Sequence, residues 1–158
     1  MIFSLVIAAG IRIVLVLLFL PFSALDKVLN FRGAVKQAQE VVVDRRLAIA
    51  FIVVGLGVEV FMSLGVVTGL ADRLCAFVLA GYCGATALLW KQFWKPRDFW
   101  SNPDGRGRTL FWDFLKNFAL AGGFLLITFG TDARSTHLFF EHPLSSTRPY
   151  ASVVASAP

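Results

Sequence analysis

The sequence predicts an all-α fold, an integral membrane protein built as a bundle of four helices. Of its 158 residues, 57% are hydrophobic and 16% are charged, whereas about a quarter of the residues in a soluble domain are charged. Four apolar stretches are each long enough to cross a bilayer, at about residues 2–25, 47–70, 74–90 and 110–130. Residues 131–158 form a polar C-terminal tail. These observations indicate one compact membrane domain.

The first stretch, residues 2–25, carries Arg12 near its middle and Pro21 near its end. It has no positively charged segment at its start and no convincing small-residue cleavage site before Asp26. We therefore expect a retained helix rather than a cleaved signal peptide. A proline inside a helix removes a backbone hydrogen bond, so we expect a kink at Pro21.

Residues 26–46 connect the first two stretches and carry five basic side chains. Apolar residues at positions 28, 31, 35 and 38 recur at helical spacing. This pattern is typical of a helix that lies at a membrane interface. An ordinary ordered loop is the alternative, and the sequence leaves both open.

The second stretch, residues 47–70, contains a single charge, Glu59, almost at its centre. As a helix, it would be roughly 36 Å long. Gly55, Glu59 and Ser63 follow one another at intervals of four residues and therefore share one helix face. Because a carboxylate in apolar surroundings needs a partner or a water-filled pocket, we expect this face to be turned into the bundle.

The third and fourth stretches carry packing and polar signals. A short polar turn at residues 71–73 predicts that the third stretch runs antiparallel to the second. Tryptophans interleaved with cations in residues 90–100 indicate an anchor at the membrane surface. In the fourth stretch, Asp113 and Asn117 share a face. The third stretch also presents small residues that let helices approach closely: Ala76, Ala80, Cys83, Gly84 and Ala87.

Basic residues are distributed unevenly between the two ends of the predicted bundle. The connectors 26–46 and 91–109 carry five each, while the opposite side carries Arg73, Arg134 and Arg148. Since positively charged loops stay in the cytoplasm, we expect both connectors to be cytoplasmic and both termini to lie on the opposite side of the membrane. The net charge of +5 then reflects topology and contact with anionic headgroups, not nucleic-acid binding.

Arg12, Glu59 and Asn117 are predicted to form a buried polar centre. In an antiparallel helix pair, Arg12 and Glu59 fall at similar depth, and an ion pair would make both charges tolerable; Asn117 could join from the fourth helix. Two interpretations stay open: a structural clip that fixes helix register, or a pocket for a quinone headgroup, a proton path or a lipid. Three charged residues are secondary candidates for this centre: Lys27, Asp113 and Lys116.

The four stretches contain no haem, flavin, metal or nucleophile–base pattern. His137 and His142 lie five residues apart in the tail, and we do not assign them a metal. We therefore expect no catalytic residue and no intrinsic cofactor, a bound quinone aside.

Several segments resemble the DoxX family of small membrane proteins. Arg12 is followed by LDKVLNF at the end of the first stretch, and the connector continues as FRGAVKQAQE, similar to the opening of that family. The segment VGLGVEVFMSLGVVTGLADRL, which contains Glu59, resembles its second helix. The segment LFWDFLKNFALAGGFLLITFG closely resembles its last helix, with a Lys–Asn pair at Lys116 and Asn117. The resemblance covers about residues 5–130.

The resemblance implies a four-helix membrane protein associated with electron transfer. One branch of the family is the small subunit of thiosulfate:quinone oxidoreductase, and another belongs to a membrane complex with superoxide-detoxifying and sulfur-transferring partners. We expect an accessory or structural subunit of a bacterial membrane-bound oxidoreductase, not an enzyme on its own, which binds other membrane or periplasmic subunits, in part through the C-terminal tail. A quinone-interacting subunit is the first alternative. A small transporter or lipid-binding protein is the second, favoured only by an open cavity around Glu59.

Overall fold

The computed structural model describes residues 2–146, and this part of the chain is all-helical, without strands. Four of its helical stretches are long and apolar enough to cross a membrane: Ile2–Leu29, Arg45–Thr68, Asp72–Trp90 and Arg106–Phe129. The prediction of four such helices is confirmed, with ends that differ by up to four residues from those predicted. The end of the predicted tail, including Arg148, lies outside the described residues.

The first stretch is kinked at Pro21, as predicted. It consists of α1 (Ile2–Val16), the π-helical segment η1 (Leu18–Ser23) and α2 (Ala24–Leu29). Pro21 lies within η1, and Leu20 has extended backbone angles (φ −122°, ψ 110°), because a residue before proline is displaced from the helical region. The helix then continues to Leu29, so Lys27 belongs to α2 and not to a loop.

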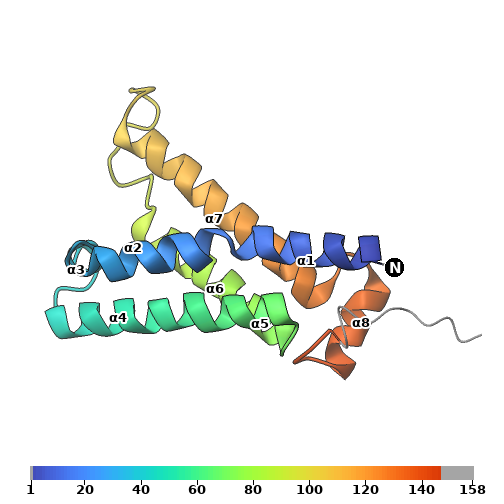
Figure 1. Cartoon of the computed structure of the whole chain (residues 1–158). Helices are drawn as coiled ribbons and strands as arrows, with labels where there is room; N and C mark the ends of the chain where they lie inside the picture. The colour runs from blue at the N-terminus through green and yellow to red at the C-terminus, as the bar shows by residue number, and fades with distance from the viewer. Residues whose placement is uncertain (1, 147–158) are drawn as a thin grey trace, which may run out of the picture.

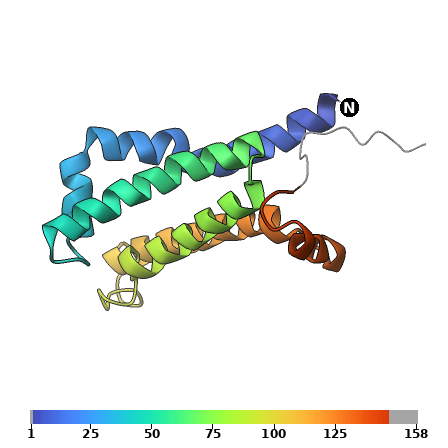
Figure 2. The same cartoon turned by 90° about the horizontal axis from the view of Figure 1, so that it is seen from below.

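The connector between the first two stretches contains a helix, α3 (Phe31–Ala38), rather than a loop throughout. Its apolar side buries Val35 and Ala38 against Ala48 of α4 (Arg45–Gly57). This contact accounts for the apolar spacing seen in the sequence. In Figure 2, α3 runs across one end of the bundle, from α2 to α4.

The second stretch is composed of α4, the π-helical segment η2 (Val58–Met62) and α5 (Ser63–Thr68). Its face with Gly55, Glu59 and Ser63 is buried, as predicted, and Glu59 is only 1% exposed. Glu59 lies inside η2. Single π-helical turns inside α-helices occur frequently at functional sites, which draws attention to this position.

The third stretch is the single helix α6 (Asp72–Trp90), which follows α5 after a tight turn. Gly69 ends α5 in the left-handed region (φ 79°), where glycine has no steric penalty. A Cβ atom at Gly65 would lie 2.3 Å from Cys75 Sγ, so this close helix approach requires glycine. The small-residue stripe of α6 faces the core, and four of its members are buried: Ala76, Ala80, Cys83 and Ala87.

The helices form two layers. Figure 1 shows α1 and α2 running beside α4 and α5, and Figure 2 shows α6 and α7 (Arg106–Phe129) in a second layer. The layers meet in a core that contains Phe19, Leu79 and Phe124. Many large apolar side chains remain exposed on the outside of the four long helices, as expected of a surface that faces lipid or partner helices.

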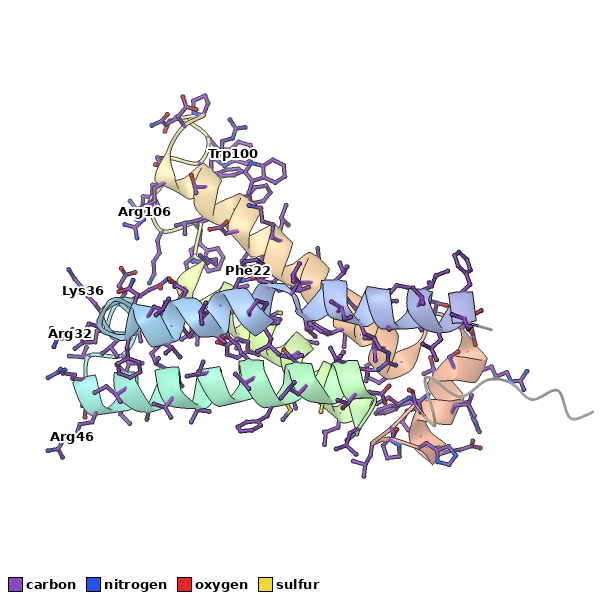
Figure 3. The ribbon with its side chains drawn as sticks, viewed as in Figure 1. Phe22, Arg32, Lys36, Arg46, Trp100 and Arg106 are labelled. Atoms are coloured by element: carbon purple, nitrogen blue, oxygen red, sulfur yellow. The ribbon has the colours of Figure 1, made fainter. Side chains whose placement is uncertain are left out.

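Residues 91–105 form a loop that folds back onto the start of α7. The Phe93 ring lies 5.1 Å from the Phe111 ring and 5.5 Å from the Phe114 ring. Asp98 Oδ1 accepts a hydrogen bond of 2.9 Å from the backbone N–H of Gly107. Trp100 is 93% exposed at this end of the molecule (Figure 3), in keeping with the aromatic anchor expected there.

The start of the C-terminal tail is the helix α8 (Ala133–Glu141), although its composition predicts a mobile terminus. Asp132 caps α8 and accepts hydrogen bonds from Ser135 N (2.8 Å) and Ser135 Oγ (3.0 Å). These bonds, the backbone bond first, lower the pKa of Asp132. The stabilisation by this cap is therefore fully present above the ordinary aspartate pKa and is lost as pH falls through the lowered value.

Candidate functional site

Glu59 is the centre of a buried polar cluster to which three of the four long helical stretches contribute. Lys27 Nζ of α2 lies 2.6 Å from Glu59 Oε1 and forms an ion pair with it. The same oxygen accepts hydrogen bonds from Ser23 Oγ at the end of η1 (3.0 Å) and from Tyr82 OH of α6 (2.9 Å). We call these four side chains the Glu59 cluster. It joins both layers of the bundle.

Local sequence features place these groups together. Ser23 and Lys27 are four residues apart and so share one helix face; Lys27 Nζ donates to Ser23 Oγ at 2.6 Å. Gly55 leaves room on the other side, since a Cβ atom there would lie 3.0 Å from Tyr82 OH. A larger residue at this position would push the phenol away from Glu59.

Two polar atoms beside this hydrogen-bond network have no partner among the described residues. They are Glu59 Oε2 and Ser63 Oγ, both shielded from solvent. All three donors of the cluster bind the other carboxylate oxygen, Oε1. An acceptor left unpaired in apolar surroundings costs free energy comparable to a lost hydrogen bond. Glu59 Oε2 is therefore a candidate acceptor for a hydrogen-bond donor beyond the described residues.

Arg12 belongs to a second buried ion pair, at the end of the bundle where α5 meets α6. Its Nη2 lies 2.6 Å from Asp72 Oδ2, and its Nη1 donates to the carbonyl of Val66 at 2.7 Å. Asp72 is fully buried at the first position of α6. A carboxylate at a helix N-terminus is also stabilised by the helix dipole.

Asp72 and its neighbour Arg73 hold the chain that follows α8. Asp72 accepts hydrogen bonds from the backbone N–H of Ser146 (2.7 Å) and from the Ser146 hydroxyl. Arg73 Nη1 donates to the carbonyls of Leu138 and His142, each at 2.9 Å. The Arg12–Asp72 pair is thus covered by residues of the C-terminal segment, and Arg73 holds the same segment in place.

The predicted ion pair between Arg12 and Glu59 is wrong. The first helical stretch extends to Leu29, and Lys27 rather than Arg12 lies at the depth of Glu59. Fifteen residues separate Arg12 from Lys27, which is roughly 22 Å along a helix. Treating Lys27 as part of a loop left Arg12 as the expected partner and placed the two helices about four turns out of register.

The fourth helix does not contribute to the Glu59 cluster. Asn117 is half-buried, and its side chain forms no hydrogen bond with any of the described residues. Asp113, a secondary candidate, instead pairs with Lys91 at 3.2 Å and with Lys116 at 3.5 Å. Of the residues proposed from the sequence for this centre, Glu59 and Lys27 meet in the Glu59 cluster, while Asp113 and Lys116 pair with each other elsewhere.

Sequence reasoning missed Ser23, Tyr82 and Asp72. Ser23 could have been found from its spacing of four to Lys27. Asp72 is the acidic residue nearest the outer end of the second stretch, where an antiparallel Arg12 must find its partner. Tyr82 gives no signal of its own, because a tyrosine in an apolar helix is typical of packing.

Comparisons of the chain with models of protein families, with curated proteins and with solved structures found no match. Within residues 2–146, no group of three or more His, Cys, Asp or Glu side chains lies close enough to hold a metal ion. His137 Nδ1 instead faces Glu141 Oε1 at 3.5 Å. The side chains of the Glu59 cluster form hydrogen bonds and one ion pair.

Removing the cation alone should destabilise the protein more than removing both charges. We expect Lys27→Met to lower the free energy of unfolding by about 3–5 kcal/mol, because it leaves the Glu59 carboxylate buried and unpaired. The double variant Lys27→Met/Glu59→Gln should recover most of this loss. Unfolding in detergent, followed by circular dichroism, measures both. Asp113→Asn is the control, since the half-exposed Lys91–Asp113 pair contributes about 0–1 kcal/mol. Equal losses in the single and double variants would contradict the pairing.

Arg73 should control the protection of the C-terminal segment. In Arg73→Met, the hydrogen bonds to Leu138 and His142 are lost, and we expect amide hydrogen exchange in residues 138–146 to accelerate about tenfold or more. Exchange in α6 should change little. Arg134→Met, on the exposed side of α8, removes the same charge and should leave this protection intact. Unchanged exchange in Arg73→Met would show that other contacts hold the segment.

Proposed function

We propose that this chain is a multi-pass protein of a bacterial inner membrane. Four long apolar helices support insertion into a membrane. Arg32, Lys36, Arg46 and Arg106 gather at one end of the molecule (Figure 3), and positively charged ends face the cytoplasm. Connectors 26–46 and 91–109 are then cytoplasmic, and both termini are periplasmic.

We further propose that the chain acts as an accessory or structural subunit of a membrane-bound oxidoreductase or respiratory assembly. The observation that supports an accessory role is the internal pairing of the buried charges. Lys27–Glu59 and Arg12–Asp72 each join two different helical stretches. They thereby define a rigid bundle whose outer faces remain apolar and available to partner helices. The oxidoreductase class rests on the resemblance to the DoxX family.

A subunit of this kind should be isolated together with its partners. Tagged protein extracted in a mild detergent should retain another membrane or periplasmic protein in a fixed ratio, and mass spectrometry identifies it. A tagged, unrelated four-helix membrane protein from the same cells controls for adhesion to apolar surfaces. Recovery of this chain alone, together with unchanged quinone-reducing activity in membranes that lack it, would exclude the accessory role.

A quinone-interacting subunit is the second candidate, and Glu59 Oε2 is the observation that favours it. A hydroquinone hydroxyl could donate to this unpaired oxygen. The adjacent π-helical segment and the kink at Pro21 place irregular backbone on both helices that carry the ion pair. The carbonyl form of the headgroup would accept a hydrogen bond from Lys27 or Tyr82 instead.

This second candidate predicts ligand-dependent stability. A soluble hydroquinone analogue in excess should raise the melting temperature of the purified protein by a few degrees, because a ligand that binds only the folded state stabilises it. Glu59→Gln should abolish the increase, since the amide presents a different pattern of donors and acceptors. Asp113→Asn should retain it. No increase in the wild type, or an equal increase in Glu59→Gln, would exclude a quinone at this position.

A further inference from the structure

A hollow of about 260 Å³ lies at the basic end of the bundle, away from the Glu59 cluster. It is bounded by the chain after α3, by the end of α6 and by the start of α7. Its walls combine two cations with apolar and aromatic side chains: Val41, Leu89, Trp90, Lys95, Arg106 and Leu110. Figure 3 shows Arg106 at the start of α7.

The charges of the hollow favour an anion. Neither Lys95 nor Arg106 forms an ion pair with another residue of the described chain. The Asp98 carboxylate, beside the start of α7, accepts a hydrogen bond from the Gly107 backbone N–H and does not line the hollow. Glu40 lines the hollow, so the two cations exceed the acidic groups by one. The planar guanidinium of arginine matches the geometry of phosphate oxygens.

The apolar part of the wall favours a lipid over a free anion. Leu89 and Leu110 lie near the ends of α6 and α7, where the apolar outer faces of these helices begin. Trp90 also lines the hollow, and its Nε1 donates a hydrogen bond of 3.2 Å to the Gln37 carbonyl. Tryptophan at such a position is typical of the headgroup level of a membrane.

The size of the hollow limits what it can enclose. Pockets for whole drug-sized ligands measure about 300–1,000 Å³, and this hollow is smaller. It suits a phosphate and its glycerol, with the acyl chains outside along α6 and α7.

We propose that this hollow binds the phosphate headgroup of an anionic phospholipid. Lys95 and Arg106 bind the phosphate, and Leu89 and Leu110 contact the first part of the acyl chains. The proposal rests on the membrane location proposed above and is independent of any oxidoreductase partner. Basic pockets between membrane helices on the cytoplasmic side are known to recognise such headgroups.

The test measures the stability of delipidated, detergent-purified protein as phosphatidylglycerol is added. We expect the melting temperature to rise with phosphatidylglycerol but not with zwitterionic phosphatidylcholine. The half-saturating concentration should increase about tenfold in Lys95→Gln/Arg106→Gln. The matched control, Arg32→Gln/Lys36→Gln, removes the same charge from exposed positions at the same end and should shift it less than about twofold.

Three outcomes would overturn the proposal. An equal increase of the half-saturating phosphatidylglycerol concentration in both double variants would indicate diffuse attraction to the basic surface rather than a site. An equal effect of phosphatidylcholine would exclude recognition of an anion. Saturation by inorganic phosphate, which then prevents the effect of phosphatidylglycerol, would identify a site for a free anion rather than a lipid.

A second measurement uses the wild-type chain, in case Lys95→Gln/Arg106→Gln does not fold. A phosphatidylglycerol carrying a photoreactive group near its headgroup should label residues 89–95 and 106–110 in preference to residues 31–38. Labelling spread evenly over these segments would contradict the site. The labelling uses the purified chain alone. A negative labelling result therefore does not bear on the proposed accessory role, and a failure to isolate protein partners does not bear on the lipid site.

Discussion

The ion pair between Lys27 and Glu59 is the interaction on which the arrangement of the helices depends. A carboxylate with 1% exposure inside an apolar bundle is stable in its charged form only with a cation in direct contact. That requirement fixes α2 against η2, and the hydrogen bond from Tyr82 extends it to α6. Gly55 is a condition for the contact with Tyr82, since a Cβ atom there would lie 3.0 Å from the phenol oxygen.

A second ion pair at a different depth makes the register of the helices unique. One ion pair between two helices fixes a single point, about which the helices can still rotate or tilt. Arg12, on the far side of the kink, adds a second point between these helices through its hydrogen bond to the Val66 carbonyl, and its ion pair with Asp72 extends this to the third stretch. Asp72 in turn binds Ser146, so the position of the C-terminal segment depends on a charge pair inside the bundle. This explains why the polar segment that follows the fourth long helix is held against the bundle.

Much of the fold could be predicted from the sequence, because apolar length and charge are properties of single segments. The four long helices, the kink at Pro21 and the buried face of Glu59 follow from such local signals. The partner of Glu59 does not, because it depends on where each helix ends and how two helices align. If the first helix ends at residue 25, Arg12 is its only cation. The helix in fact extends to Leu29 and so includes Lys27, which pairs with Glu59. The predicted contribution of Asn117 to the polar centre is wrong for a related reason, since the sequence of α7 alone does not specify which helix Asn117 faces.

The way in which Glu59 is bound bears on whether it is only a clip. A carboxylate whose only role is to fix helix register contributes most to stability when hydrogen-bond donors bind both of its oxygens, since each unpaired acceptor costs desolvation energy. Here Lys27, Ser23 and Tyr82 all bind Oε1, and Oε2 has no partner in the described part of the chain. Three donors on one oxygen fix the orientation of the carboxylate in advance, which is the property that a binding site requires. The same ion pair can therefore hold the bundle together and present one oxygen to a ligand.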